Sequence, residues 1–236
     1  MSNNTIQNFS EEDIKNFSQM KSEMYRIATS MKAYRNAKRF ETLFRRCLRA
    51  GYPVDFSIGK SDDTLLYTTL ESGMAEVVKM ANILIEAGAD VNHENFRNEN
   101  ALMLASRYSY GFRATENLIP VLLPLTKDLE CKNKFGETAL MLFCQRVCIY
   151  SYDTLDAQDT GYIKQFLDAG ANIDDLLDPD KWKMSNTSYW KRTPRDNIIN
   201  KRIDNIKNFL LKYNMKQSIK AEMQSQQYVE CFDYSL

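Results

Sequence analysis

Apolar residues recur along most of the chain at helical spacing, in short runs that are separated by polar turns. Between Ile14 and Met31 they fall three, four or seven positions apart, which is typical of one buried helix face. Ser10 precedes this run as an N-cap residue. A second run extends from Phe40 to Leu48 and stops before Gly51. We expect an all-α protein without strands.

The stretch from Met80 to Leu104 indicates how these helices are joined. An apolar run ends in Ala-Gly-Ala-Asp-Val-Asn, and a polar turn leads to a new helix at Ala101. Gly88 can adopt the left-handed conformation that closes a helix, and Asp90 and Asn92 favour a turn. This pattern predicts two helices with a structured turn between them.

Similar phrases recur along the chain, with nine or ten positions from each of the first three turn anchors to the next opening residue and a longer, increasing distance within the units. Helix-ending phrases begin at Ala50, Lys127 and Asp168, and helix-opening phrases begin at Thr64, Thr138 and Thr193. The turn anchor Val91 precedes the opening residue Asn100 by nine positions, and Leu129 precedes Thr138 by nine. Recurrence at a fixed spacing is typical of repeat proteins.

These phrases resemble those of the ankyrin repeat, whose second helix ends in Leu-Leu-x-x-Gly-Ala-Asp-Val-Asn and whose next unit opens with Gly-x-Thr-Pro-Leu-His-x-Ala. The resemblance implies an all-α ankyrin-repeat solenoid of about four to five helix-turn-helix units. The expected organisation is an N-terminal tail and capping helix (1–39), units at about 40–56, 60–92, 95–130, 133–174 and 188–215 within a domain of 40–215, and a C-terminal tail (216–236).

The helical spacing within these units predicts a shared apolar core. Its members are Leu66, Leu70, Val77, Ile83, Leu84, Leu102, Ala105, Leu118, Leu122, Leu140, Phe143, Ile163 and Phe166. Pro120 and Pro124 fall inside the second outer helix, where each removes a backbone donor, so we expect a break there. Residues 148–160 form a tyrosine-rich and acidic insertion, which is either a contact surface or a solvated loop.

Bulk composition adds little to this picture. The 236 residues carry a formal net charge of zero, so no global field indicates a nucleic-acid or membrane partner. Five cysteines show no metal-ligand spacing, and we expect them to be reduced and packed. The first residues lack the pattern of a signal peptide. We expect a cytoplasmic, monomeric protein with no membrane segment.

The sequence offers few groups for catalysis. His93 is the single histidine, and it falls in a turn directly after the Asp-Val-Asn phrase. No catalytic triad, glycine-rich phosphate loop or metal triad is visible. We therefore predict that the protein is not an enzyme and needs no cofactor or metal.

The resemblance implies protein binding through the tips of the turns and through the inner helices. Counting from the helix-opening residues places an aromatic residue at three of the four tips, which either contacts a partner or packs against a neighbouring turn. The candidate partner-binding residues are Phe96, Arg97, Arg107, Tyr108, Lys134, Phe135, Gln145, Arg146, Tyr150, Tyr152, Tyr189 and Trp190.

The predicted function is a non-enzymatic module that recognises a partner protein and inhibits or sequesters it, for example an immunity protein that neutralises a toxin. An alternative is a viral, phage or bacterial effector that captures a host protein and acts in the host cytoplasm. A further alternative is nucleic-acid binding through the basic cluster of 32–49, which could also be a solvated helix face. That cluster contains Lys32, Arg35, Lys38, Arg39, Arg45, Arg46 and Arg49.

Overall fold

The computed structural model describes residues 11–29, 36–57, 63–71, 76–107, 113–150, 155–178 and 196–233. The structure is mostly helical, at 69%, and the described residues contain no strand. Ser57 and Thr64 form an isolated bridge. The chain divides into two compact units, the first with residues 1–143 and 162–171 and the second with residues 144–161 and 172–236. The all-α fold predicted from the sequence is confirmed.

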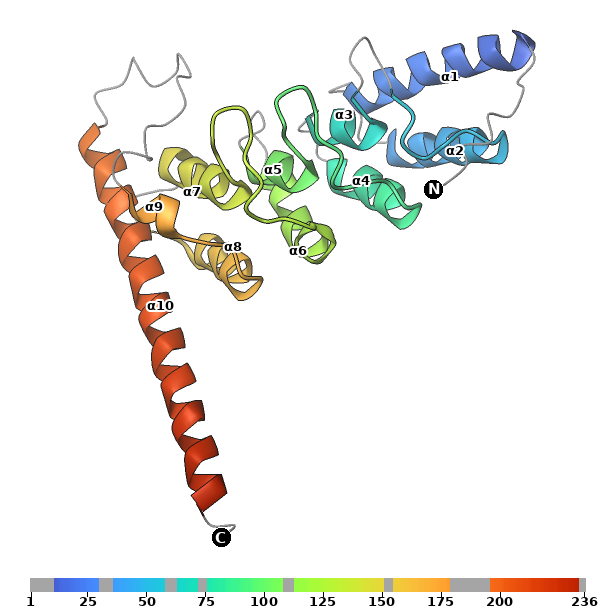
Figure 1. The fold of residues 1–236 in the computed structure, drawn as a ribbon. Coiled ribbons are helices and arrows are strands. Elements are labelled where there is room, and N and C mark those ends of the chain that lie inside the picture. The colour runs from blue at the N-terminus through green and yellow to red at the C-terminus, as the bar shows by residue number, and fades with distance from the viewer. Residues whose placement is uncertain are drawn as a thin grey trace. The chain divides into compact units, whose positions relative to one another are not determined.

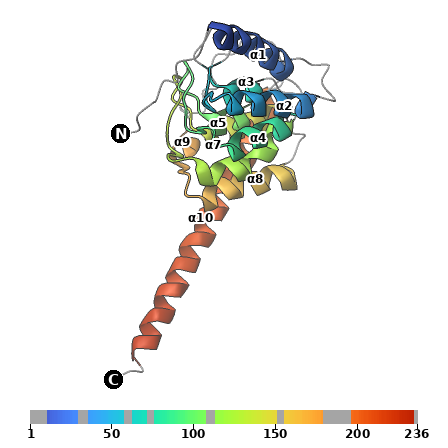
Figure 2. The ribbon, with the colours of Figure 1, turned by 90° about the vertical axis from the view of Figure 1, so that its right-hand side faces the viewer.

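The first unit is built from two rows of short helices. Its helices are α1 (Glu11–Thr29), α2 (Asn36–Arg49), α3 (Leu65–Glu71), α4 (Val77–Glu86), α5 (Ala101–Ser106), η1 (Arg113–Leu118), α6 (Ile119–Leu122) and η2 (Leu123–Leu125). Figure 1 shows α3 and α5 side by side in one row and α4 and α6 in a second row. The helix α1 packs on α2 and α3, as Figures 1 and 2 show.

The predicted core lies between these rows. All of its members are buried except Ile83, which is half-buried. Two further helices supply residues to the first unit, α7 (Ala139–Tyr150) and α8 (Ala157–Asp168). The ring of Phe143 lies 5.7 Å from that of Tyr162 and 5.9 Å from that of Phe166. Burial of these large rings provides the non-directional attraction that holds the helices together.

The three glycine-containing phrases end their helices in the same way. Gly51, Gly88 and Gly170 have φ angles of 86°, 90° and 94°. The amide after each glycine donates to a carbonyl five residues back, as from Ala89 to Leu84 at 3.0 Å. This is the Schellman arrangement, which satisfies carbonyls at the end of a helix. The helix-ending role predicted for these phrases is confirmed.

The two prolines divide the second outer helix as expected. Pro120 is the second residue of α6 and Pro124 is the second residue of η2, and η1 precedes both as a 3-10 helix. At these positions a proline lacks only an amide that a helix would leave unpaired. The prediction of a break is confirmed.

The second unit contains the end of α7, the start of α8, α9 (Asp174–Leu177) and α10 (Asp196–Asp233). Within the expected insertion of 148–160, residues 148–150 belong to α7 and residues 157–160 belong to α8, whereas 151–154 lie outside the described residues. Asp156 caps α8 by accepting the amide of Asp159 at 2.6 Å. Asp159 itself is buried, so it is not part of an exposed acidic loop.

The helix α10 differs from the expected closing unit and tail. It is one helix of 38 residues, which passes without a break through the boundary expected at residue 215. No glycine or proline occurs between Asp196 and Asp233, so nothing in the sequence ends the helix at the expected position. Among the described residues, no helix has both the length and the apolar character needed to cross a membrane.

Replacing glycine by alanine should lower stability at the helix-closing Gly88 and raise it at Gly161 inside α8. Gly88→Ala should lower the free energy of unfolding by about 1–2 kcal/mol, because alanine is strained at its φ of 90°. Gly161→Ala is the matched control, since this glycine lies inside α8 and has open space where the Cβ of an alanine would lie. It should raise stability by about 0.5–1 kcal/mol. Urea unfolding measures both, and a loss of stability at both sites would contradict this account.

Candidate functional site

Two turns of the first unit are built on a buried asparagine. The Oδ1 of Asn95 accepts the amides of Arg97 and Glu99 at 2.8 and 2.9 Å. The Oδ1 of Asn133 accepts the corresponding amides of Phe135 and Glu137 at 2.9 and 3.0 Å. These side chains satisfy backbone donors that have no helix or strand partner. Both turns therefore have one fixed shape.

A glutamate completes each turn. The Nδ2 of Asn95 donates to the Oε2 of Glu99 at 3.0 Å, and the same bond joins Asn133 to Glu137 at 3.0 Å. All four side chains are buried. A buried carboxylate is costly unless it is hydrogen-bonded, so each asparagine and its glutamate stabilise one another.

The two turns are joined at their tips. The amide of Lys134 donates to the carbonyl of Arg97 at 2.9 Å. The residue after each tip has a positive φ, 57° at Asn98 and 79° at Gly136. Asparagine and glycine tolerate this conformation best. The bond holds the two tips beside one another in the first unit.

Two exposed phenylalanines occupy these tips. Phe96 is 60% exposed and Phe135 is 64% exposed. The guanidinium carbon of Arg97 lies 4.9 Å from the centre of the Phe96 ring, within the range of a cation–π contact. Lys134 is exposed beside Phe135. We call Phe96, Arg97, Lys134 and Phe135 the tip pair.

The predicted tip residues thus lie together on an exposed surface. The alternative that both phenylalanines pack against neighbouring turns does not fit their exposure. Exposed aromatic rings do not stabilise a fold, and they are enriched where proteins bind one another. The tip pair is the strongest candidate site in the described residues.

Arg107 has a structural role in addition to its predicted place on the binding surface. Its guanidinium lies 2.8 Å from the Oε1 of Glu71 and 3.6 Å from the Oε1 of Glu99. These two ion pairs connect α3 to the first tip turn. A partner that contacts Arg107 would meet a side chain whose charge is already balanced.

Gln145 and Arg146 were predicted to be binding residues, but both side chains are buried in the structure. They are 9% and 7% exposed, and every residue from Met141 to Cys148 is buried. The exposed surface predicted from the sequence therefore does not include them. The physical reason is that residues 141–148 of α7 are buried on every side of the helix, whereas a binding residue must be exposed to a partner.

The other candidate residues fall where no side chain is described. Tyr108, Tyr152, Tyr189 and Trp190 lie outside the described residues, and only the backbone of Tyr150 is described. Their assignment to a binding surface remains a prediction.

Sequence reasoning missed the hydrogen bonds that link successive helix-ending turns. Asp55 accepts the amide of Asp90 at 3.0 Å, and Asn92 accepts the amide of Lys127 at 2.9 Å. Both bonds span 35 residues. The signal available in the sequence was an acceptor side chain in each of two successive helix-ending turns, at Asp55 and at Asn92. These bonds fix the distance between neighbouring turns.

The basic cluster is partly neutralised on α2. Arg39 forms an ion pair with Glu23, and Arg45 lies 2.7 Å from Glu41. Arg46 and Arg49 are exposed in the last turn, where cations favour the helix dipole. Lys32 and Arg35 lie outside the described residues. This arrangement is closer to a solvated helix face than to a phosphate-binding patch.

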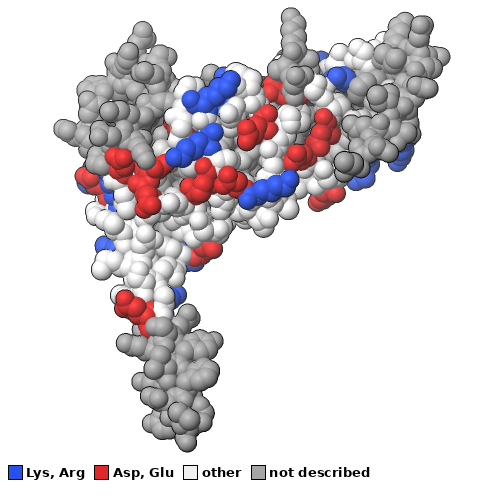
Figure 3. All heavy atoms as spheres, viewed as in Figure 1, with Lys and Arg blue, Asp and Glu red and all other residues white. Residues whose placement is uncertain are grey.

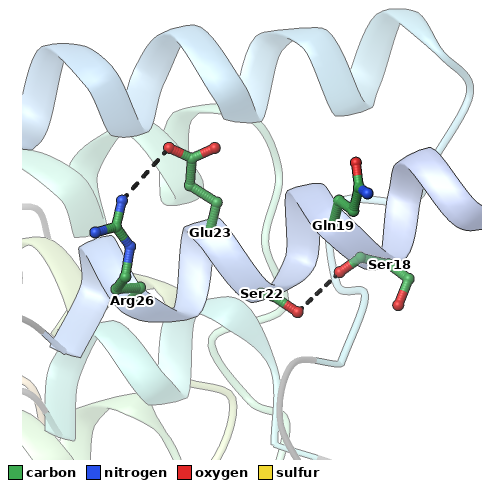
Figure 4. A pocket seen from close by; sticks show the side chains of 5 residues that line it. All are labelled: Ser18, Gln19, Ser22, Glu23 and Arg26. Atoms are coloured by element: carbon green, nitrogen blue, oxygen red, sulfur yellow. Dashed lines mark hydrogen bonds and ion pairs between the residues drawn. The ribbon is translucent and has the colours of Figure 1, made fainter.

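An open hollow of about 460 Å³ lies along α1, lined by Ser18, Gln19, Ser22, Glu23 and Arg26. Figure 4 shows that all five side chains come from this one helix. Ser22 donates to the carbonyl of Ser18 at 2.9 Å, and Arg26 lies 3.7 Å from Glu23. The polar groups thus pair within α1 or, for Glu23, also with Arg39 of α2, and they do not converge on a ligand.

The four cysteines whose side chains the structure describes are unsuited to nucleophilic chemistry. Cys47, Cys144 and Cys148 are buried and Cys131 is half-buried, and all four are free thiols. Burial raises the pKa of each of these thiols, and it raises that of Cys148 to about 12. The thiolate is the reactive form, so these cysteines act as small apolar residues. Within the described residues, no group of three or more potential ligands could hold a metal ion.

The phenol of Tyr67 has a raised pKa. Its side chain is buried beside Glu71, Asn95, Glu99 and Arg107. Burial raises its pKa from the usual 10.0 to about 12. The neutral phenol is therefore favoured in the folded state.

On the face of the molecule drawn in Figure 3, surface charge does not single out a further site. On the face shown in Figure 3, acidic and basic side chains are interspersed over the described surface. A surface of mixed charge suits a partner of mixed charge.

Comparisons with known proteins do not assign a family. No protein-family model matches the chain, and no curated protein is similar to it. The candidate site is therefore argued from its geometry.

The turn network predicts a stability change at Asn95. Asn95→Ala should lower the free energy of unfolding by about 2–3 kcal/mol, because two backbone amides and the carboxylate of Glu99 lose a partner. Glu94→Ala, at the exposed neighbouring position, should change it by less than about 0.5 kcal/mol. Urea unfolding of both variants is the measurement. Equal changes in the free energy of unfolding for both variants would show that the hydrogen bonds of Asn95 do not stabilise the turn.

The pKa of Tyr67 predicts a loss of stability at high pH. The raised pKa contributes stability that is fully present below pH 10, the unfolded value, and is lost as pH rises towards the folded value of about 12. Tyr67→Phe lacks this contribution, so between pH 10 and pH 12 its free energy of unfolding should fall less than that of the wild type. The exposed Tyr25, changed to phenylalanine, is the control. Parallel pH profiles for wild type and Tyr67→Phe would refute the assignment.

Proposed function

We propose that the chain is an ankyrin-like protein-binding module that recognises a partner protein through the tip pair. Support comes from the repeated construction of the first unit, in which three helices close with the same glycine geometry and two turns share one asparagine–glutamate network. Repeated turns on short helix pairs are the expected form of such a scaffold.

One observation carries the proposal. Phe96 and Phe135 are exposed at the tips of two turns whose backbones are tied together, although Phe96 follows its turn asparagine by one position and Phe135 follows its own by two. A folded chain gains nothing from exposing two phenylalanines, but a binding surface gains rigid anchors. Because the turns are already ordered, binding would cost little conformational entropy.

The charges of the tip pair restrict the partner. Arg97 lies over the ring of Phe96, and the exposed Lys134 directly precedes Phe135 in the chain. Such a surface would suit a partner that offers apolar pockets next to carboxylates. We propose a role in inhibition or sequestration, either as an immunity protein that neutralises a toxin or as an effector that captures a host protein. Either role fits a protein that acts in a cytoplasm.

Two other functions receive less support. Nucleic-acid binding through the basic cluster would need cations that are not already paired, and Arg39 and Arg45 contact carboxylates. An enzymatic function would need an activated nucleophile or base, and we nominate no described residue for either role.

The proposal predicts a binding defect without a folding defect. The double variant Phe96→Ala and Phe135→Ala should retain the stability of the wild type within about 0.5 kcal/mol, because both rings are exposed. Its affinity for the partner should fall at least about 30-fold, the effect of removing one binding hot spot of about 2 kcal/mol. The measurement is capture of the partner from the native lysate, followed by titration with the purified partner.

A matched control separates the tips from exposed apolar surface in general. Leu125→Ala removes an exposed aliphatic side chain from η2, outside the tip pair. It should leave binding unchanged. The proposal is wrong if the partner binds the double variant as tightly as the wild type, or if Leu125→Ala weakens binding equally.

A further inference from the structure

The helix α10 has one apolar face that is buried and another that is exposed. Ile206 and Leu210 are buried, whereas Leu211, Met215 and Ile219 are 47%, 64% and 52% exposed. The three exposed residues are spaced by four positions, so they form one row along the helix. A turn of 100° per residue places this row on the side away from Ile206 and Leu210.

A row of lysines runs beside the exposed apolar row. Lys212, Lys216 and Lys220 are exposed and follow Leu211, Met215 and Ile219 by one position each. No ion pair joins these three lysines to other described residues. Residues 201–222 hold six lysines and arginines against two acidic residues, in a chain whose net charge is zero. Positive charge is therefore concentrated in the middle of α10, whose ends carry Asp196, Glu230 and Asp233.

The exposed part of α10 lacks the packing that normally sustains a helix. Every residue from Asn214 to Glu222 is exposed. Most helical stability in proteins comes from packing of an apolar face, and isolated helices are marginal in water. A partner that covered the apolar row would supply the missing packing.

We propose that the exposed rows of α10 are a docking helix for a partner protein that has an apolar groove with an acidic rim. Leu211, Met215 and Ile219 would enter the groove as anchors at positions i, i+4 and i+8. Lys212, Lys216 and Lys220 would pair with the carboxylates of one rim. This inference goes beyond the proposed function, because it uses a different surface from the tip pair.

Two other occupants fit the rows less well. An antiparallel pairing with a second copy of α10 would bring the two lysine rows together, and like charges repel. A helix that lies on a membrane needs a broad apolar face. Viewed down the helix axis, with a turn of about 100° per residue, the three apolar residues cover an arc of only about 80°. The three lysines lie on one side of that arc.

The test is photocrosslinking of the full chain in its native lysate. A benzophenone amino acid replaces Met215 in the exposed row, and the control carries it at Gln217, which is exposed on another face. We expect a protein other than this chain to crosslink from position 215 at least tenfold more than from position 217. Mass spectrometry should place the crosslink in an apolar segment flanked by aspartate or glutamate.

A second variant tests the lysine row. Lys212→Glu, Lys216→Glu and Lys220→Glu in one chain should reduce the crosslink at least tenfold, while circular dichroism shows unchanged helix content. The change of Phe96 and Phe135 to alanine should leave the crosslink intact, which separates this result from failure of the tip pair.

Four outcomes would overturn the docking helix. These are the absence of any crosslinked protein, equal crosslinking from positions 215 and 217, crosslinking only to a second copy of the chain, and insensitivity to the charge reversal. A binding assay of the full chain with phosphatidylserine vesicles completes the test. Binding of the full chain to them with the same dependence on the lysine row, and without a crosslinked protein, would assign the rows to an anionic membrane.

Discussion

The first unit depends on an asparagine side chain that replaces regular secondary structure inside a turn. Asn95 and Asn133 each accept two backbone amides and donate to a glutamate of the same turn. Buried amides must be paired, and no strand is available in the described residues. The asparagines therefore make it possible for the chain to turn tightly and still bury the turn. The exposed positions of Phe96 and Phe135 follow from this constraint.

Hydrogen bonds between successive turns also fix the position of one turn relative to the next. Asn92 receives the amide of Lys127, and the amide of Lys134 reaches the carbonyl of Arg97. Each bond satisfies a backbone group of one turn with an acceptor of the preceding turn. Because packed interiors also fix the distance between helices, the two tips have little freedom to separate. A binding surface made from both tips is thus a property of the pair of turns and not of either phenylalanine alone.

Local rules explain what could be predicted from the sequence. Gly88 and Pro120 act through backbone conformation alone, so the helix end and the helix break were predictable. The buried state of Arg146 depends on which residues cover α7, and the ion pair of Arg107 with Glu71 joins residues 36 positions apart. Neither is encoded in a local pattern. The continuity of α10 was encoded, since no helix-breaking residue occurs in it, but the repeat spacing suggested an end at residue 215.

The two candidate surfaces differ in how a partner would be held. The tip pair is ordered before binding and displays its rings on a fixed backbone, so its contribution would lie mainly in slow dissociation. The lysine row of α10 acts at longer range, and its attraction for carboxylates would appear as fast association that salt suppresses. Salt would therefore weaken recognition through α10 much more than recognition through the tips.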